Sequence, residues 1–398
     1  MSKIIISGVG CCLLDYLYTQ IDFGGPVFSK YLSKTDADGG LNPGKLVFTE
    51  EFEKFSNKEF EAILDELVGS KNPDTYNIGG PAIVALIHAS QLLHNIADVY
   101  YYGAMGTDTI GATLMEIIEE TPVHISQMKR VDKSSPFTYV FSDPDYNQGQ
   151  GERTFVNNIG SAWDFITEDI DEHFFQSDIV LLGGTALVPK IHDNLYDILV
   201  RAKNSNIITV VNTVYDFRNE KANPGNRWPL GNTDETYRCI DILIMDLEEA
   251  LRLSGKNDAE NACNFFIDQG ISSFFITNGS QPVTFYSDGK VFMQTPLTQL
   301  PVSEAIIQEM KYNTGLMGDT TGCGDNFTGG ILASVAWQIK EREIGKLDMY
   351  DACAWGISSG GFACLYVGGT YLEKRDGEKI NLVRPYYHSY KNQIKDQL

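Results

Sequence analysis

The sequence predicts an α/β protein, a three-layer sandwich in which helices cover both faces of a mostly parallel central sheet. Short apolar segments such as residues 179–182 and 207–211 alternate with longer amphipathic segments along most of the chain. Strands that crossover helices bury on both faces have this continuous apolar character. With 398 residues, of which 43% are apolar, the chain is long enough to bury a large core.

The expected elements follow this pattern in order. Residues 3–7 are a buried first strand, which we expect to end at Gly8-Val9-Gly10. Residues 16–76 are polar and aromatic and carry several turn signals, which indicates a protruding subdomain with a helix near residues 58–68. Further expected elements are helices at 81–93 and 110–119, a strand at 99–102, a hairpin pairing 138–141 with 153–156, and strands at 179–182, 207–211, 240–244 and 273–276. Residues 296–318 are expected to contain neither a strand nor a long helix.

Composition narrows the possible partners. The chain has 31 basic and 53 acidic side chains, a net charge of −22, which disfavours nucleic acid and anionic membrane surfaces. A phosphorylated ligand must therefore be held by local devices such as a helix N-terminus or a metal ion. The first residues resemble neither a signal peptide nor a membrane span, and the seven cysteines form no Cys-x-x-Cys pair. We expect a cytoplasmic protein with reduced thiols and no zinc site, because its six histidines are scattered.

The most informative motif is Asp-Thr-Thr-Gly-Cys-Gly-Asp at residues 319–325, which runs directly into an apolar helix. A glycine turn that opens a helix directs several N–H groups and the positive end of the helix dipole at one point. Asp325 places a carboxylate beside that point, so the motif predicts a phosphate site with an adjacent base. The alternative is that Asp325 only caps the helix.

This motif resembles the [Asp/Asn]-Thr-x-Gly-Ala-Gly-Asp signature of the ribokinase-like (pfkB) family of carbohydrate and nucleoside kinases, with Cys323 in place of alanine. The resemblance implies a ribokinase-like domain over residues 1–398, with a small β lid to which residues 16–76 and 134–158 contribute. It implies transfer of the ATP γ-phosphoryl group to a primary hydroxyl of a sugar or nucleoside. Asp325 would be the base, and the N–H groups of Gly322, Cys323 and Gly324 would form the anion hole.

Other matches imply the acceptor site. Asn-Ile-Gly-Gly at residues 77–80 resembles the second family signature, and residues 8–15 resemble the adenosine kinase form of the first strand and its aspartate. The implied acceptor-binding residues are Asp15, Asn77, Gly79, Gly80 and Arg153. Whether Arg153 faces the substrate or the surface stays open. An asparagine that many relatives carry near residue 83 or 84 is missing, so the sequence does not choose between a sugar and a nucleoside.

The resemblance also implies the nucleotide and metal contacts. Asp246 and Glu249 resemble the family's Asn-x-x-Glu motif, in which the glutamate acts on Mg²⁺ through water; the alternative is that both only stabilise a helix dipole. The implied nucleotide-binding residues are Thr277, Gly279, Asp319, Thr320, Ile357 and Gly368. ATP and Mg²⁺ are the implied cofactors, and a monovalent cation is left open. Leu13 replaces the third glycine of a dinucleotide fingerprint, and no P-loop motif occurs.

Two questions remain at the level of the sequence. A catalytically idle member of the family that binds a sugar or nucleotide as a sensor is a second hypothesis, although such a module needs no base at Asp325. Cys323 is either a reactive thiol at a helix N-terminus or a small buried side chain. We expect a small-molecule partner and a monomer or homodimer.

Overall fold

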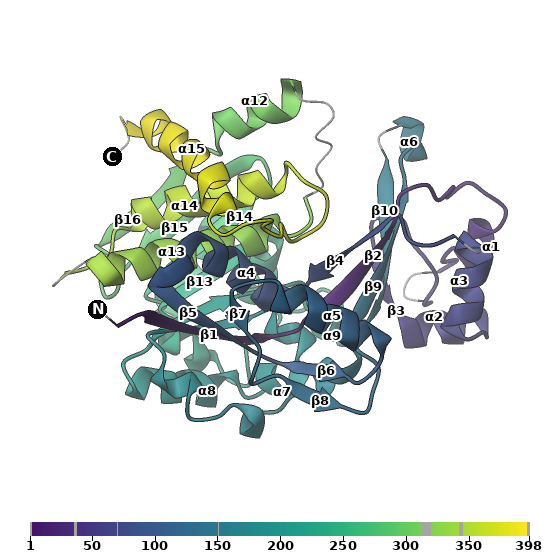
Figure 1. The fold of residues 1–398 in the computed structure, drawn as a ribbon, viewed down its shortest axis with the longest axis horizontal. Coiled ribbons are helices and arrows are strands. Elements are labelled where there is room, and N and C mark those ends of the chain that lie inside the picture. The colour runs from purple at the N-terminus through teal and green to yellow at the C-terminus, as the bar shows by residue number, and fades with distance from the viewer. Residues whose placement is uncertain are drawn as a thin grey trace.

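The computed structural model describes residues 2–35, 38–69, 71–149, 151–312, 320–341 and 345–395. Within these residues the large sheet has the strand order β16-β15-β14-β13-β12-β11-β1-β5-β7. Neighbouring strands from β7 to β14 are parallel, and β15 and β16 are antiparallel additions at one edge (Figure 1). Its strands are β1 (Ile4–Gly10), β5 (Ala97–Tyr102), β7 (Val123–His124), β11 (Ile179–Gly183), β12 (Ile208–Asn212), β13 (Ile242–Asp246), β14 (Ser273–Asn278), β15 (Gln281–Ser287) and β16 (Thr295–Leu300).

Helices cover both faces of this sheet, which confirms the predicted three-layer sandwich. Along β11 the side chains alternate: Ile179 and Leu181 belong to one apolar cluster, and Val180 and Leu182 to another. The first face is covered by α4 (Pro81–Leu93), α5 (Thr109–Glu119), α12 (Glu304–Tyr312), α13 (Cys323–Glu341), α14 (Met349–Ala363) and α15 (Glu378–Gln393). The second face is covered by α7 (Pro189–His192), α8 (Leu195–Asn204), α10 (Leu247–Ser254) and α11 (Ala259–Asp268).

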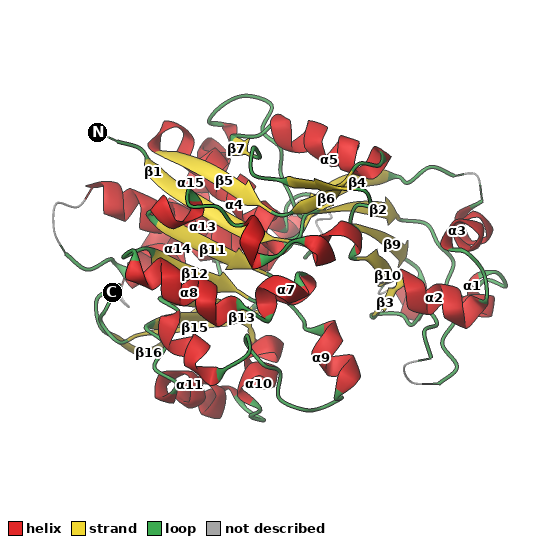
Figure 2. Ribbon diagram, turned by 90° about the horizontal axis from the view of Figure 1, so that it is seen from below, coloured by secondary structure: helices red, strands yellow, loops and turns green. Residues whose placement is uncertain are grey.

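A separate small sheet lies beside the carboxyl ends of the large one, with the strand order β3-β10-β9-β2-β4 (Figure 2). Its strands are β2 (Leu13–Tyr18), β3 (Leu46–Phe48), β4 (Thr75–Gly79), β9 (Phe137–Asp143) and β10 (Glu152–Asn158). The helices α1 (Phe28–Tyr31), α2 (Thr49–Ser56) and α3 (Phe60–Val68) pack on its outer side around a third apolar cluster. The remaining strands and α-helices are β6 (Ala104–Gly106), β8 (Lys129–Val131), α6 (Tyr146–Gly149) and α9 (Phe217–Ala222).

Two sequence expectations are wrong. The first strand does not end before Gly8 but continues to Gly10. Its glycines do not break the strand; they let α4 approach the sheet. An added Cβ at Gly8 would lie 2.7 Å from Leu86, and one at Gly10 would lie 2.6 Å from the Cβ of Ala82. Residues 296–312 hold most of β16 and all of α12, whereas 313–318 lie outside the described residues. Both elements bury few side chains, so neither has the apolar period that predicts a strand or a helix.

None of the helices in the described part of the chain has the length and hydropathy that a membrane span needs.

Candidate active site

The glycine turn before α13 is built by close backbone contact. Gly322 has a φ of 73°, and an added Cβ there would lie 2.6 Å from the Cα of Gly369, so only glycine fits. Gly324 differs, because a Cβ built on it would meet no atom of the described residues within 4 Å. The space outside the first turn of α13 is therefore open, and a side chain at Gly324 would fill it.

The first turn of α13 leaves N–H groups available to that space. Cys323 N–H donates to the carbonyl of Thr320 at 3.3 Å, and Asn326 N–H donates to the carbonyl of Gly322 at 2.8 Å. Among the described residues, the N–H groups of Gly324 and Asp325 have no backbone acceptor. Because α13 is 19 residues long, its dipole also favours an anion at this end.

Asn326 holds this turn in place and was not identified from the sequence. Its side-chain amide donates to the carbonyls of Gly322 and Gly369, both at 2.8 Å, and its carbonyl oxygen accepts from the Tyr366 hydroxyl at 3.3 Å. One buried side chain therefore joins the signature turn to the glycine turn that follows α14. Nothing in a single sequence distinguishes such a residue from an ordinary position in a helix.

Asp325 lies in the first turn of α13, beside the carboxyl end of β12. The side-chain amide of Asn212, the last residue of β12, lies 3.5 Å from Asp325 Oδ1. Part of the residue is still reached by solvent, but the surrounding protein atoms desolvate the carboxyl group and raise its pKa to about 7. A carboxylate with a pKa near neutrality is suited to accept a proton in a reaction.

An acidic pair lies at the end of β13, the next strand of the sheet. Asp246 and Glu249 form a capping box on α10: Glu249 N–H donates to Asp246 Oδ1 at 2.8 Å, and Asp246 N–H donates to Glu249 Oε2 at 3.0 Å. Thr213 also donates to Glu249. Burial and the charge of Asp246 raise the pKa of Glu249, and the charge of Asp325 adds to this effect. The carboxyl groups of Asp246, Glu249 and Asp325 therefore form one acidic cluster at the carboxyl ends of β12 and β13.

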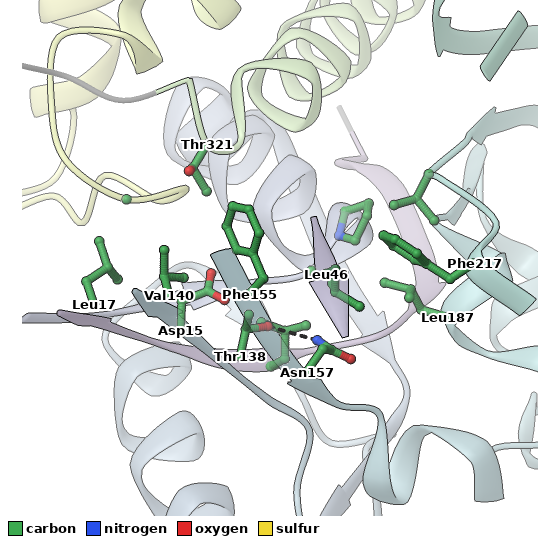
Figure 3. Close-up of a pocket in the computed structure, with 15 residues that line it drawn as sticks. Asp15, Leu17, Leu46, Thr138, Val140, Phe155, Asn157, Leu187, Phe217 and Thr321 are labelled. Atoms are coloured by element: carbon green, nitrogen blue, oxygen red, sulfur yellow. Dashed lines mark hydrogen bonds between the residues drawn. The ribbon is translucent and has the colours of Figure 1, made fainter. Parts of the chain in front are cut away.

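A pocket lies between the small sheet and the signature turn (Figure 3). Asp15 of β2 and Thr138 of β9 line one side, and Thr321 of the turn lines the opposite side. Asp15 is 9% exposed, and an added Cβ at Gly79 would lie 2.3 Å from its Oδ2. Gly79 thus makes room for the carboxylate. Most of the other lining residues are apolar: Leu13, Leu17, Leu46, Val140, Phe155, Leu187, Val214 and Phe217.

Asn157 is a pocket residue that sequence reasoning missed. Its amide donates to Thr138 Oγ1 at 2.8 Å, and its buried carbonyl oxygen has no hydrogen-bond partner within the described residues. It supplies a carboxamide to the pocket although positions 83 and 84 do not. The signal was available, because Arg153, Phe155 and Asn157 alternate along β10 and so share one face of the strand.

Asn77, Gly80 and Gly368 shape the rim of the pocket. The side-chain amide of Asn77 donates to the carbonyl of Thr370 at 3.1 Å, and an added Cβ at Gly368 would lie 2.2 Å from this amide nitrogen. Gly80 has a φ of 113°, and its Cβ would collide with the carbonyl of Cys11 at 2.2 Å. Asn77 therefore binds the turn containing Gly368, while Gly80 and Gly368 themselves line the pocket.

Arg153 connects the small sheet to the signature turn. Its guanidinium donates to Thr321 Oγ1 at 3.1 Å, so the side chain faces the signature turn and not only the outer surface. This contact connects β10 to the residue just before Gly322.

The structure gives the remaining predicted nucleotide contacts different surroundings. Thr277 lies near the end of β14, where it pairs with Asp246, and Gly279 follows the strand; within the described residues no atom lies within 4 Å of a Cβ built on Gly279. Ile357 is 5% exposed and belongs to the main apolar cluster. Thr320 is exposed, whereas Asp319 lies outside the described residues. In the described ranges no group of three or more His, Cys, Asp or Glu side chains is arranged to hold a metal ion.

The sequence and the fold of this chain resemble those of known kinases. A curated relative, 2-dehydro-3-deoxygluconokinase of Dickeya dadantii (strain 3937), is 23% identical over 271 residues, which cover 64% of this chain and 79% of the relative. The fold matches adenosine kinase from Schistosoma mansoni in complex with 2-fluoroadenosine with a TM-score of 0.69, 15% identity and coverage of 93% of this chain and 98% of the other.

A putative ribokinase II from E. coli in complex with ATP and Mg²⁺ matches with a TM-score of 0.64 and 14% identity, over 98% of this chain and 99% of the other. At these identities the structural likeness shows a shared ribokinase-like fold. The family model "pfkB family carbohydrate kinase" matches residues 55–375, which is most of the chain. The chain therefore belongs to the pfkB family of carbohydrate kinases, which are phosphotransferases.

Proposed function

We propose that this protein is an ATP-dependent kinase that phosphorylates a primary hydroxyl of a sugar or nucleoside. The observation that carries the proposal is the position of Asp325, whose carboxyl group has a pKa near 7 at the same helix end whose N–H groups face open space. An aspartate that only caps a helix would not require open space beside the helix N-terminus. Phosphoryl transfer needs an oriented hydroxyl, an acceptor for its proton and compensation of phosphoryl charge, and this end of α13 offers the last two.

The site fits a phosphorylated nucleotide with Mg²⁺. Available N–H groups at Gly324 and Asp325 suit phosphate oxygens, and the acidic pair Asp246 and Glu249 suits a hydrated Mg²⁺ ion. When bound, MgATP supplies the phosphoryl group and part of its charge compensation. Thr277, which pairs with Asp246 near the end of β14, and Gly279, which follows the strand, are proposed to contact the nucleotide, together with Thr320, Ile357 and Gly368.

The acceptor binds between the small sheet and the turn. The Asp15 carboxylate and the carbonyl oxygen of Asn157 both accept hydrogen bonds, so they suit a ligand with several hydroxyl donors. The apolar residues that line the rest of the pocket suit the C–H face of a sugar ring. Thr321 lines the pocket just before the start of α13, so we propose that an acceptor hydroxyl bound at this side reaches Asp325, which removes its proton as transfer proceeds.

Two relatives point to different acceptors, a sugar acid in one case and a nucleoside in the other. The deciding experiment measures ADP release with MgATP and separate panels of pentoses, hexoses, sugar acids and nucleosides. Acceptor-dependent ADP release with one class supports a kinase and names its substrate. Thermal stabilisation by an acceptor without any ADP release across all four panels would contradict the kinase and support a binding module.

A further inference from the structure

Two cysteines meet at the signature turn. Cys323 is the first residue of α13, and Cys364 is the C-cap residue of α14. Their sulfur atoms lie 3.3 Å apart, although the residues are 41 positions apart in the sequence. The helix ends are held at this distance by backbone packing, because an added Cβ at Gly360 of α14 would lie 2.8 Å from the carbonyl of Cys323.

We propose that Cys323 and Cys364 are a pair of thiols that can be oxidised to a disulfide, and that this disulfide disables the turn proposed to bind phosphate. A disulfide places its sulfurs about 2.05 Å apart, so they need to approach by roughly 1.2 Å. Both residues are half-buried, which leaves the pair within reach of small oxidants. The other five thiols are less reactive toward oxidants, because burial raises the pKa of Cys11, Cys12, Cys239, Cys263 and Cys353 and so disfavours their thiolates.

The reaction is a thiol–disulfide exchange with a low-molecular-weight disulfide such as glutathione disulfide. One cysteine loses its proton and attacks the oxidant, which forms a mixed disulfide and releases one glutathione thiolate. The second cysteine loses its proton and attacks the protein sulfur of that mixed disulfide, which releases the second glutathione. Two protein thiols are oxidised to one disulfide, one glutathione disulfide is reduced to two thiols, and these take up the two protons.

The consequence for the site follows from where Cys323 lies. It contributes to the first turn of α13, between Gly322 and the open N–H group of Gly324. Drawing its side chain toward Cys364 moves that turn, and Asp325 within it, relative to Asn212 at the end of β12. A misplacement of about 1 Å in a site that depends on orientation lowers turnover by about 100-fold. This consequence rests on the proposed kinase activity, whereas formation of the disulfide does not.

The test equilibrates the full chain in glutathione buffers in which reduced glutathione is in excess, so that an isolated cysteine stays reduced. Peptide mass spectrometry is expected to find a Cys323–Cys364 link, with about 100-fold lower turnover that dithiothreitol restores. Cys364→Ser keeps a donor for the Gly360 carbonyl, which Cys364 now contacts at 3.9 Å, and should show normal turnover and no loss in the same buffers. Cys364→Ala is the second variant, and Cys239→Ser is the matched control that should behave as wild type.

Absence of the linked peptide, or a link that leaves turnover unchanged, would overturn the proposal. If the chain phosphorylates no acceptor, the proposed kinase activity fails separately. In that case thermal stabilisation by MgATP is compared in the two redox states. Loss of stabilisation on oxidation supports the dithiol, and equal stabilisation in both states overturns it.

Discussion

The guanidinium of Arg153 donates a hydrogen bond to the hydroxyl of Thr321 at 3.1 Å and so connects the small sheet to the turn that opens α13. Arg153 begins the face of β10 that continues with Phe155 and Asn157, both of which line the pocket between the small sheet and the signature turn. One side chain therefore connects the strand that lines the pocket to the signature turn. Interactions that order β10 therefore also position Thr321, the residue before Gly322.

Replacing Arg153 with Ala should lower kcat/KM for the acceptor by about 10–100-fold, because a hydrogen bond from a charged donor contributes about 1.5–3 kcal/mol. Arg153→Lys keeps the charge without the planar fork and should lose less. Steady-state kinetics on both variants measure the effect. If both variants match wild type, the contact with Thr321 has no part in the reaction.

Asp325→Asn should keep binding of MgATP and acceptor within a few-fold and lower kcat by about 10²–10⁴-fold, since the amide cannot take a proton. The matched control is Asp258→Asn, which changes the N-cap aspartate of α11 far from the site. Calorimetric binding and turnover separate the two effects. Near-normal turnover of Asp325→Asn with its true substrate would rule out the base.

The pH dependence follows from the raised pKa of Asp325. Because the base must be deprotonated, kcat/KM should fall as the pH drops below about 7 and level off above it. The same shift affects stability: between the usual carboxyl range and about 7 the folded chain holds a proton that the unfolded chain releases, so stability falls as pH rises through this window.

Asp325→Asn removes the loss of stability that the raised pKa of Asp325 causes at higher pH. Its Tm should exceed the wild-type Tm above the raised pKa of Asp325, and the difference should shrink in acid. Thermal unfolding across a pH series measures this, and a Tm difference that does not change with pH would argue against a raised pKa.

Glu249→Gln should raise the Mg²⁺ concentration needed for half-maximal activity about 10–100-fold while leaving the acceptor KM nearly unchanged. Glutamine also fits a capping box, so α10 should keep its start. Glu248→Gln removes the same charge from the exposed neighbouring position and is the control. Identical Mg²⁺ titrations for the two variants would restrict Glu249 to its capping role.

Asp15→Ala should weaken the acceptor and spare MgATP, because ligand hydroxyls lose a charged acceptor worth about 1.5–3 kcal/mol per bond. Asp65→Ala on α3, outside the pocket, serves as control. Separate titrations of the two ligands measure the effect. Equal weakening of both would assign Asp15 a role in folding of the small sheet.

The fold class was readable from the sequence because parallel strands buried on both faces are continuously apolar, as residues 179–182 show. The edge elements β16 and α12 were not readable, since both bury few residues and are held by pairing with β15 and by contacts with neighbouring helices. The glycines of β1 misled for a related reason. Their function is to let α4 approach, which depends on an element that lies some 70 residues later in the chain.

For the site, the sequence alone determined which residue types are present at the signature turn and the position of Asp325 in the first turn of a helix, since both are local. Only the tertiary structure decided which distant groups face it. Asn157 supplies the pocket's carboxamide, Asn326 joins two glycine turns, and Cys364 touches Cys323. Such contacts join segments far apart in the chain, and the packing of α13 against α14 and of the small sheet against the turn sets their geometry.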